Sequence, residues 1–145
     1  MGAPRPRQAV VLDAGALIGL ERGDEKMTAL LEASLSADFR FLVPAAVLAQ
    51  VWRDGAKQTR LARFLKTPEV AVLPLSEQQA KAAGALCGMT KSSDVVDASV
   101  VIVAREHRCA VVTSDPGDLG RLDPALQLHL LRLPARPRHG RARGS

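Results

Sequence analysis

Residues 93–104 read Ser93-Asp94-Val95-Val96-Asp97-Ala98-Ser99-Val100-Val101-Ile102-Val103-Ala104, and this stretch sets two carboxylates into an apolar segment of helical length. From Val95 onward only Asp97 and Ser99 are polar, so a helix here is apolar almost all round and is expected to be buried. An ionised carboxylate without a partner inside a protein is strongly destabilising. Asp97 therefore needs a hydrogen-bond donor, a cation or a proton.

Short aliphatic runs elsewhere in the chain predict the strands of a parallel sheet. Residues 9–12 and 109–113 are continuous, β-branched runs of the kind that form central strands. Similar runs at 39–43 and 70–75 predict two more strands, and the weakly alternating residues 126–133 predict an edge strand. Helical segments separate these runs and imply crossover connections. The expected fold class is therefore α/β, with a central parallel sheet of about five strands covered by helices on both faces.

Capping residues and apolar spacing predict where the connecting helices begin. The expected starts are Asp24 as an N-cap, Pro44 as a first-turn proline, and Ser76 with Gln79 as a capping box. The helix from Pro44 is expected to reach about Asp54 or Lys57, and the helix after Ser76 to reach about Cys87. Residues 114–118 follow the last central strand as an expected acid-bearing loop.

The length of 145 residues fits a single domain. This domain is expected to span residues 9–133, between a short basic N-terminal arm at 1–8 and a Pro/Arg/Gly-rich C-terminal tail at 134–145. A hydrophobic content of 47% excludes a disordered chain, while an aromatic content of 3% predicts an aliphatic core. So few aromatic rings argue against RNA binding by base stacking.

The net charge of +5 is concentrated at the two ends of the chain. Seven of the 20 lysines and arginines are terminal arginines, so residues 8–131 hold 13 basic and 15 acidic groups, a net charge of −2. The terminal arginines could touch RNA or simply form solvated tails, and the charge alone does not separate these alternatives.

Cysteine usage and the N-terminal residues indicate a cytoplasmic protein without a membrane segment. Cys87 and Cys109 lie 22 positions apart with no metal-binding spacing, so we expect two core residues in a reducing compartment. Two prolines at positions 4 and 6 precede an apolar run that Asp13 interrupts. This pattern is neither that of a signal peptide nor that of a spanning helix.

Four aspartates fall where an α/β fold places its functional groups. Asp13 and Asp115 follow two expected central strands, whose carboxyl ends border the crevice of such a sheet. Asp94 and Asp97 are three residues apart at the start of one helix and so share a side. Taken singly, each has an ordinary explanation, because aspartate is common at helix N-caps and in turns.

Taken together, the four carboxylates point to a cation. Two like charges ~5 Å apart repel by about 3 kcal/mol at an effective dielectric constant of about 20. A hard divalent ion, Mg²⁺ or Mn²⁺, is the natural partner for such an all-oxygen site. No His, Cys, Tyr or Lys is obviously placed as a nucleophile, so metal-activated water and phosphodiester hydrolysis are the expected chemistry. Thr113 could steady the ligands, or it could simply cap a loop.

Four segments, in this order and spacing, resemble the PIN-domain family, and in particular VapC-type toxins of toxin–antitoxin pairs. They are Val11–Ala14, Val43–Arg53, Ser93–Ala98 and Thr113–Leu119. The resemblance covers about residues 9–133. It implies a Mg²⁺- or Mn²⁺-dependent endoribonuclease that cleaves RNA, is inhibited by a cognate VapB-type antitoxin, and is usually a homodimer. A metal-dependent phosphatase is a weaker alternative, because Asp13-Ala14-Gly15 lacks its Asp-x-Asp pair.

The resemblance also assigns residues. By position, Asp13, Asp97 and Asp115 match the family's metal-binding acids, Asp94 is an additional acid found in some members, and Asp118 lies at a further, often acidic, position. Gln50 stands where the family usually has Glu and offers an uncharged carbonyl oxygen. Asp94, or Asp54 one turn further along the expected helix, could compensate for it. The alternative function is a catalytically impaired module that binds RNA or an antitoxin without cleaving.

Two surfaces could contact partners. A first set of basic residues recurs at helical spacing beyond Gln50 and predicts a rim for RNA phosphates or for an antitoxin's acidic tail, although an ordinary solvated face has the same pattern. These residues are Arg53, Lys57 and Arg60. A second set could line a groove for an antitoxin helix, but its spacing is more typical of core. These residues are Leu17, Leu20, Leu30 and Leu31.

Overall fold

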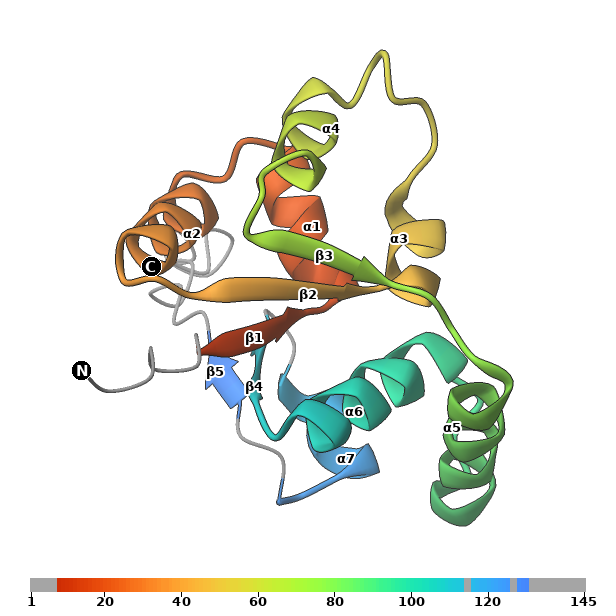
Figure 1. The fold of residues 1–145 in the computed structure, drawn as a ribbon. Helices are drawn as coiled ribbons and strands as arrows, with labels where there is room; N and C mark the ends of the chain where they lie inside the picture. The colour runs from red at the N-terminus through yellow and green to blue at the C-terminus, as the bar shows by residue number, and fades with distance from the viewer. Residues whose placement is uncertain (1–7, 114–115, 126–127, 131–145) are drawn as a thin grey trace, which may run out of the picture.

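A parallel sheet forms the centre of the molecule (Figure 1). The computed structural model describes residues 8–113, 116–125 and 128–130. Four strands carry the sheet, and the three-residue β5 (Leu128–Leu130) pairs with the outer side of β4. The four are β1 (Ala9–Leu12), β2 (Arg40–Pro44), β3 (Val70–Leu73) and β4 (Ala110–Thr113). All neighbours are parallel and the order is β3-β2-β1-β4-β5, which confirms the predicted α/β class and parallel sheet.

Seven helices in the described residues flank this sheet. They are α1 (Ala14–Glu21), α2 (Glu25–Ser36), α3 (Ala45–Val51), α4 (Thr59–Leu65), α5 (Glu77–Thr90), α6 (Val95–His107) and α7 (Pro116–Leu122). Connections between parallel strands are right-handed, so the chain places α1 to α4 on one face and, after crossing back past β1, α5 to α7 on the other. The packing largely agrees, because α1 lies against α2, α3 and α4, whereas α6 lies against α5 and α7; helix α3 also contacts α6.

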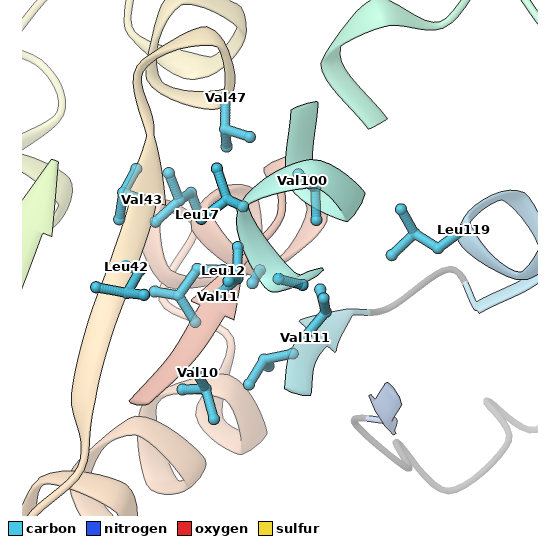
Figure 2. Close-up of a cluster of buried hydrophobic side chains, with 14 of the residues drawn as sticks. Val10, Val11, Leu12, Leu17, Leu42, Val43, Val47, Val100, Val111 and Leu119 are labelled. Atoms are coloured by element: carbon cyan, nitrogen blue, oxygen red, sulfur yellow. The ribbon is translucent and has the colours of Figure 1, made fainter. Parts of the chain in front are cut away.

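The apolar segment at residues 95–104 lies in a buried helix, as predicted. Every residue of α6 from Ala98 to Ala104 is buried, and its polar member, Ser99, donates from its hydroxyl to the Val96 carbonyl at 2.7 Å. Figure 2 shows Val100 of α6 gathered with Val11 of β1 and Val111 of β4 in one aliphatic cluster. The core is therefore built from branched aliphatic side chains on either side of the central strands.

The predicted helix caps and core residues are found in the structure. Asp24 caps α2 by accepting from the backbone N–H groups of Lys26 and Met27, and Ser76 with Gln79 forms the reciprocal capping box of α5. The two cysteines are free thiols, Cys87 buried and Cys109 half-buried. Burial raises the pKa of the Cys109 thiol, against the smaller opposing effect of a hydrogen bond with the Val11 backbone. The four leucines offered as a groove belong to the core or pack against it.

The helix from Pro44 ends at Val51, and the prediction that it reaches Asp54 or Lys57 is wrong. Gln58 provides the reason, because its side-chain oxygen accepts from the N–H groups of Arg53 at 2.9 Å and Asp54 at 3.1 Å. Its amide nitrogen donates to the Val51 carbonyl at 3.0 Å. One side chain thus replaces the hydrogen bonds that another helical turn would have made, and residues 52–58 form a loop.

Two further boundaries differ from the sequence prediction. The acid-bearing loop expected at 114–118 becomes helical from Pro116, because Leu119 and Leu122 lie three residues apart and both are buried. Proline suits a first helical position, where its missing N–H costs nothing. Helix α5 runs to Thr90 rather than Cys87 and ends where Lys91 takes a left-handed backbone conformation, with φ of 55°.

Other predictions fall on parts of the chain that the structure does not describe. The C-terminal tail at 134–145 and all but the last residue of the N-terminal arm at 1–8 lie outside the described residues. The edge strand expected at 126–133 is described only over 128–130, where β5 lies.

The burial of α6 predicts a contrast between two valines of the same helix. Val100→Ala removes a fully buried side chain and should lower the free energy of unfolding by about 2 kcal/mol. Val95→Ala, where the valine is 57% exposed, should change it by less than about 0.5 kcal/mol. Urea denaturation of both variants measures the difference, and equal losses would contradict the buried packing of α6.

Candidate active site at the carboxyl edge of the sheet

Asp13 lies directly after β1 and is 5% exposed. It is the N-cap of α1, with its Oδ1 accepting from the backbone N–H of Ala16 at 2.9 Å. Its own N–H donates to the carbonyl of Val112 on β4 at 3.4 Å, so it lies at the edge where β1 and β4 both end. Asp13 is therefore a helix cap, and it also occupies the predicted crevice position.

Thr113 is the last residue of β4 and is fully buried. The pairing of Leu12 with Val112 places it beside Asp13 at the same edge. Asp115 follows two residues later and lies outside the described residues, so its predicted role stays a prediction. Asp118 belongs to helix α7 rather than to a loop, and its side chain is likewise outside the described part.

The other two acids begin α6. Because α6 leads directly into β4 and runs back along the sheet, its N-terminus lies toward the carboxyl edge (Figure 1). Asp94 is the N-cap, and its Oδ1 accepts from the N–H of Asp97 at 2.9 Å. Asp94 is exposed, whereas Asp97 is half-buried because full burial of the helix starts one residue later, at Ala98.

Asp94 and Asp97 line a common cavity of about 260 Å³, here named the Asp97 cavity. Its other walls are the end of α5 with the turn that follows it (Thr90, Lys91, Ser92) and the last turn of α7 (Arg121, Leu122). The predicted pairing of the two acids on one side is thus confirmed. Sequence reasoning missed the two cationic side chains, Lys91 and Arg121, because one lies in an expected loop and the other in a helix that was not predicted.

The sequence-predicted acids do not all meet in the described part of the molecule. Gln50 is exposed in the last turn of α3, and neither it nor Asp13 is among the residues that line the Asp97 cavity. Among the described side chains, no group of three or more His, Cys, Asp or Glu is close enough together to hold a metal ion. Asp115 and the side chain of Asp118 lie outside the residues to which that finding applies.

The available donors nevertheless have the chemistry of a hard-cation site. Asp13, Asp94 and Asp97 offer only carboxylate oxygens, the ligands that Mg²⁺ and Mn²⁺ prefer. Asp13 is buried at the strand edge and Asp97 faces a cavity large enough for hydrated ions. The donor set therefore fits a divalent cation of this class.

The basic residues beyond Gln50 do not form the helical stripe that their spacing predicts. Arg53 and Lys57 lie in the 52–58 loop, and only Arg60 is helical, in α4. The Arg53 guanidinium donates to the carbonyl oxygens of Trp52 and Ala49, at 2.7 and 3.1 Å, and so caps the end of α3.

The Arg60 side chain lies over the turn between α1 and α2. Its guanidinium covers Gly23, where an added Cβ would come within 2.9 Å of the Arg60 Cζ. Asp54 also fails to continue the face of Gln50, because it lies in the loop and its Oδ1 accepts from the N–H of Ala56 at 3.1 Å. Of the two residues suggested to compensate for Gln50, only Asp94 lies on a helix that carries another candidate acid.

These observations define the protein as an α/β domain that carries carboxylates at the carboxyl edge of a parallel sheet. The sequence model of the PIN domain family matches residues 10–123, and the chain belongs to this family. No curated protein matches the sequence closely enough to count as a relative.

Solved structures with the same fold include toxin–antitoxin proteins. A chain of the VapBC2 complex from Rickettsia felis, bound to a promoter DNA fragment, superposes with a TM-score of 0.66 and is 16% identical, covering 85% of this chain and 98% of that one. FitAcB from Neisseria gonorrhoeae gives 0.58 at 21% identity, covering 82% and 95%. VapC20 from Mycobacterium tuberculosis, a Sarcin-Ricin loop cleaving toxin, gives 0.59 at 16% identity, covering 77% and 95%. Identities this low establish the shared fold.

None of the helices in the described part of the chain combines the length and the apolar character that crossing a membrane requires.

Two substitutions separate the capping oxygen of Asp94 from the charge of its carboxylate. Asp94→Ala removes the cap and should cost about 1 kcal/mol of stability, whereas Asp94→Ser keeps a capping oxygen and should stay within about 0.5 kcal/mol of wild type. Thermal or urea denaturation measures both. Equal losses would show that the carboxylate charge, rather than the cap, stabilises the start of α6.

Proposed function

We propose that this chain is the toxin of a type II, VapBC-like toxin–antitoxin system and acts as a Mg²⁺- or Mn²⁺-dependent endoribonuclease. The observation that carries the proposal is the position of Asp13 and of the Asp94–Asp97 pair toward the carboxyl edge of the sheet, in a domain of the PIN family. Toxin–antitoxin complexes and a Sarcin-Ricin loop cleaving toxin among the structures of similar fold support it.

The proposed metal ligands are Asp13, Asp97 and Asp115, with Asp94 as a further acid. A divalent ion held there would supply an activated water and would stabilise the leaving oxygen of a phosphodiester. The chain's own residues prepare the site. The Ala16 N–H fixes the orientation of the Asp13 carboxylate, and the Asp94 cap fixes the first turn of α6, from which Asp97 projects. Thr113 and Asp118 are proposed to support these ligands.

Gln50 is the basis of a second candidate function. It places a neutral amide at a position where the resemblance expects a carboxylate, and Asp54 lies in a separate loop where it cannot extend the same helical face. A chain with fewer negative charges at its metal site binds divalent ions more weakly. The alternative is therefore a PIN-fold module that binds RNA or an antitoxin without cleaving.

The proposed partners follow from the same fold. A VapB-type antitoxin is proposed because the similar structures include complexes of toxin with antitoxin. RNA is the proposed substrate, a homodimer the proposed assembly, and the cytoplasm the proposed location. Arg53, Lys57 and Arg60 are the proposed contacts for RNA or antitoxin; all three are exposed, and Arg53 and Arg60 also lie against the protein's own backbone.

Asp97→Asn tests the proposed activity. The wild-type protein should cleave RNA with Mg²⁺ or Mn²⁺ and lose this activity in EDTA, because the site needs a cation. Asp97→Asn should reduce cleavage by at least about 10²-fold, as expected when a charged metal ligand becomes neutral. Calorimetric titration with Mn²⁺ should show weaker binding in the variant. Full cleavage by Asp97→Asn protein free of contaminating nuclease would refute the proposal.

Gln50→Glu separates the two candidate functions. Restoring a carboxylate should tighten Mn²⁺ binding and raise RNA cleavage if the native site is impaired, since each added carboxylate strengthens a hard-cation site. Gln50→Ala is the matched control, because it removes the amide without adding charge. If Gln50→Glu changes neither metal affinity nor cleavage, Gln50 lies outside the working site.

A further inference from the structure

The Asp97 cavity has an acidic side and a basic side. Asp94 and Asp97 come from the start of α6, while Lys91 comes from the turn before it and Arg121 from the last turn of α7. Both cationic residues are exposed. The volume, about 260 Å³, is close to the lower limit of about 300 Å³ for small-molecule sites. It therefore suits a phosphate group and its sugar rather than a folded partner.

The backbone at Lys91 is fixed by its surroundings. Lys91 ends α5 in a left-handed conformation and donates its backbone N–H to the Cys87 carbonyl. The next residue, Ser92, also donates its N–H to Cys87, at 3.0 Å, and its hydroxyl oxygen accepts from the N–H of Asp94 at 3.1 Å. The turn that presents Lys91 is thus tied to the same residue that caps α6.

Arg121 is held in place from the other side of the cavity. Its helix, α7, is anchored by the buried side chains of Leu119 and Leu122. Just beyond the helix, the Asp123 carboxylate pairs with Arg105 of α6 at 2.9 Å, and the Asp123 side chain is only 12% exposed. Helix α6 therefore positions Arg121 and Asp97 together, and neither needs a flexible loop.

The cavity carries charges complementary to a metal ion on its acidic side and to RNA phosphates on its basic side. The two carboxylates attract a divalent cation, and the two cations match the negative phosphates of a strand that approaches that ion. We propose that Lys91 and Arg121 bind RNA phosphates beside the Asp97 site and so position the strand for cleavage. This inference rests on the proposed function, and it names residues that neither the sequence resemblance nor the acidic constellation assigns.

RNA binding in EDTA tests the inference without cleavage. A fluorescein-labelled single-stranded RNA is titrated with wild-type protein, Lys91→Gln, Arg121→Gln and the double variant, and fluorescence anisotropy gives each Kd. The double variant should bind at least ~10-fold more weakly at ~50 mM salt, and the slope of log K against log salt should fall by about 0.7 for each phosphate that is no longer bound.

Two substitutions of equal charge change serve as controls. Lys81→Gln alters an exposed lysine on the outside of α5, and Arg40→Gln alters an exposed arginine at the amino end of β2, the opposite edge of the sheet. Neither should change the affinity by more than about 2-fold or shift the salt slope measurably, since exposed charges far from a strand contribute little. Urea denaturation of all variants establishes that each remains folded.

The outcomes separate the inference from the proposed function. If the Lys91 and Arg121 variants bind RNA as the controls do, the inference is wrong even when wild-type protein cleaves RNA. If they bind more weakly but wild-type protein with Mn²⁺ does not cleave, Lys91 and Arg121 are RNA-binding residues, whereas the proposed nuclease activity and their role in positioning a strand for cleavage fail. If the variants lose affinity for a poly-glutamate peptide but not for RNA, the cavity serves an acidic protein segment and the RNA assignment is overturned.

Discussion

The burial of α6 is the constraint on which the rest of the structure depends. Seven consecutive residues from Ala98 to Ala104 are removed from water, and a helix that is apolar on all sides can be satisfied only between a sheet and other helices. It packs against β1, β2 and β4 on one side and against α3, α5 and α7 on others. Since α6 must enter this layer from the carboxyl edge in order to lead into β4, its first turn brings Asp97 there. The position of the candidate ligand is therefore a result of packing.

Helix capping and candidate chemistry use the same residues at this edge. Asp13 caps α1 and Asp94 caps α6, each with one carboxylate oxygen on a backbone N–H at 2.9 Å. The question posed by the sequence was whether these acids are caps or ligands, and the geometry shows that capping does not exclude the second role. A carboxylate has two oxygens and about four acceptor positions, so a cap leaves capacity for other partners.

Much of the fold could be predicted from local pattern. The strands were found because they are continuous aliphatic runs, and the caps at Asp24 and Ser76 were found because their hydrogen bonds span only three residues. The end of α3 at Val51 could not be found this way, because Gln58 reaches back seven residues to stop the helix. Likewise α7 depends on burial of Leu119 against the rest of the domain, which periodicity over so short a segment does not reveal.

The candidate site, like the fold, could be predicted where it depends on local sequence pattern. Pairing Asp94 with Asp97 needs only helical spacing, and placing Asp13 needs only the end of a strand. The helical stripe expected through Arg53, Lys57 and Arg60 does not form, because it requires a continuous helix. Lys91 and Arg121 are 30 positions apart, and only the packing of α7 against α5 and α6 brings them to one cavity.

The two capping carboxylates also bear on whether the chain folds before or after it would bind a metal ion. Each lies at the positive end of a helix dipole, which offsets part of its negative charge before any cation arrives. An acidic edge neutralised in this way does not need a metal ion in order to fold, unlike small domains in which metal binding and folding are one step. The polypeptide can therefore reach its final shape first, and the ion binding proposed above would follow as a separate step.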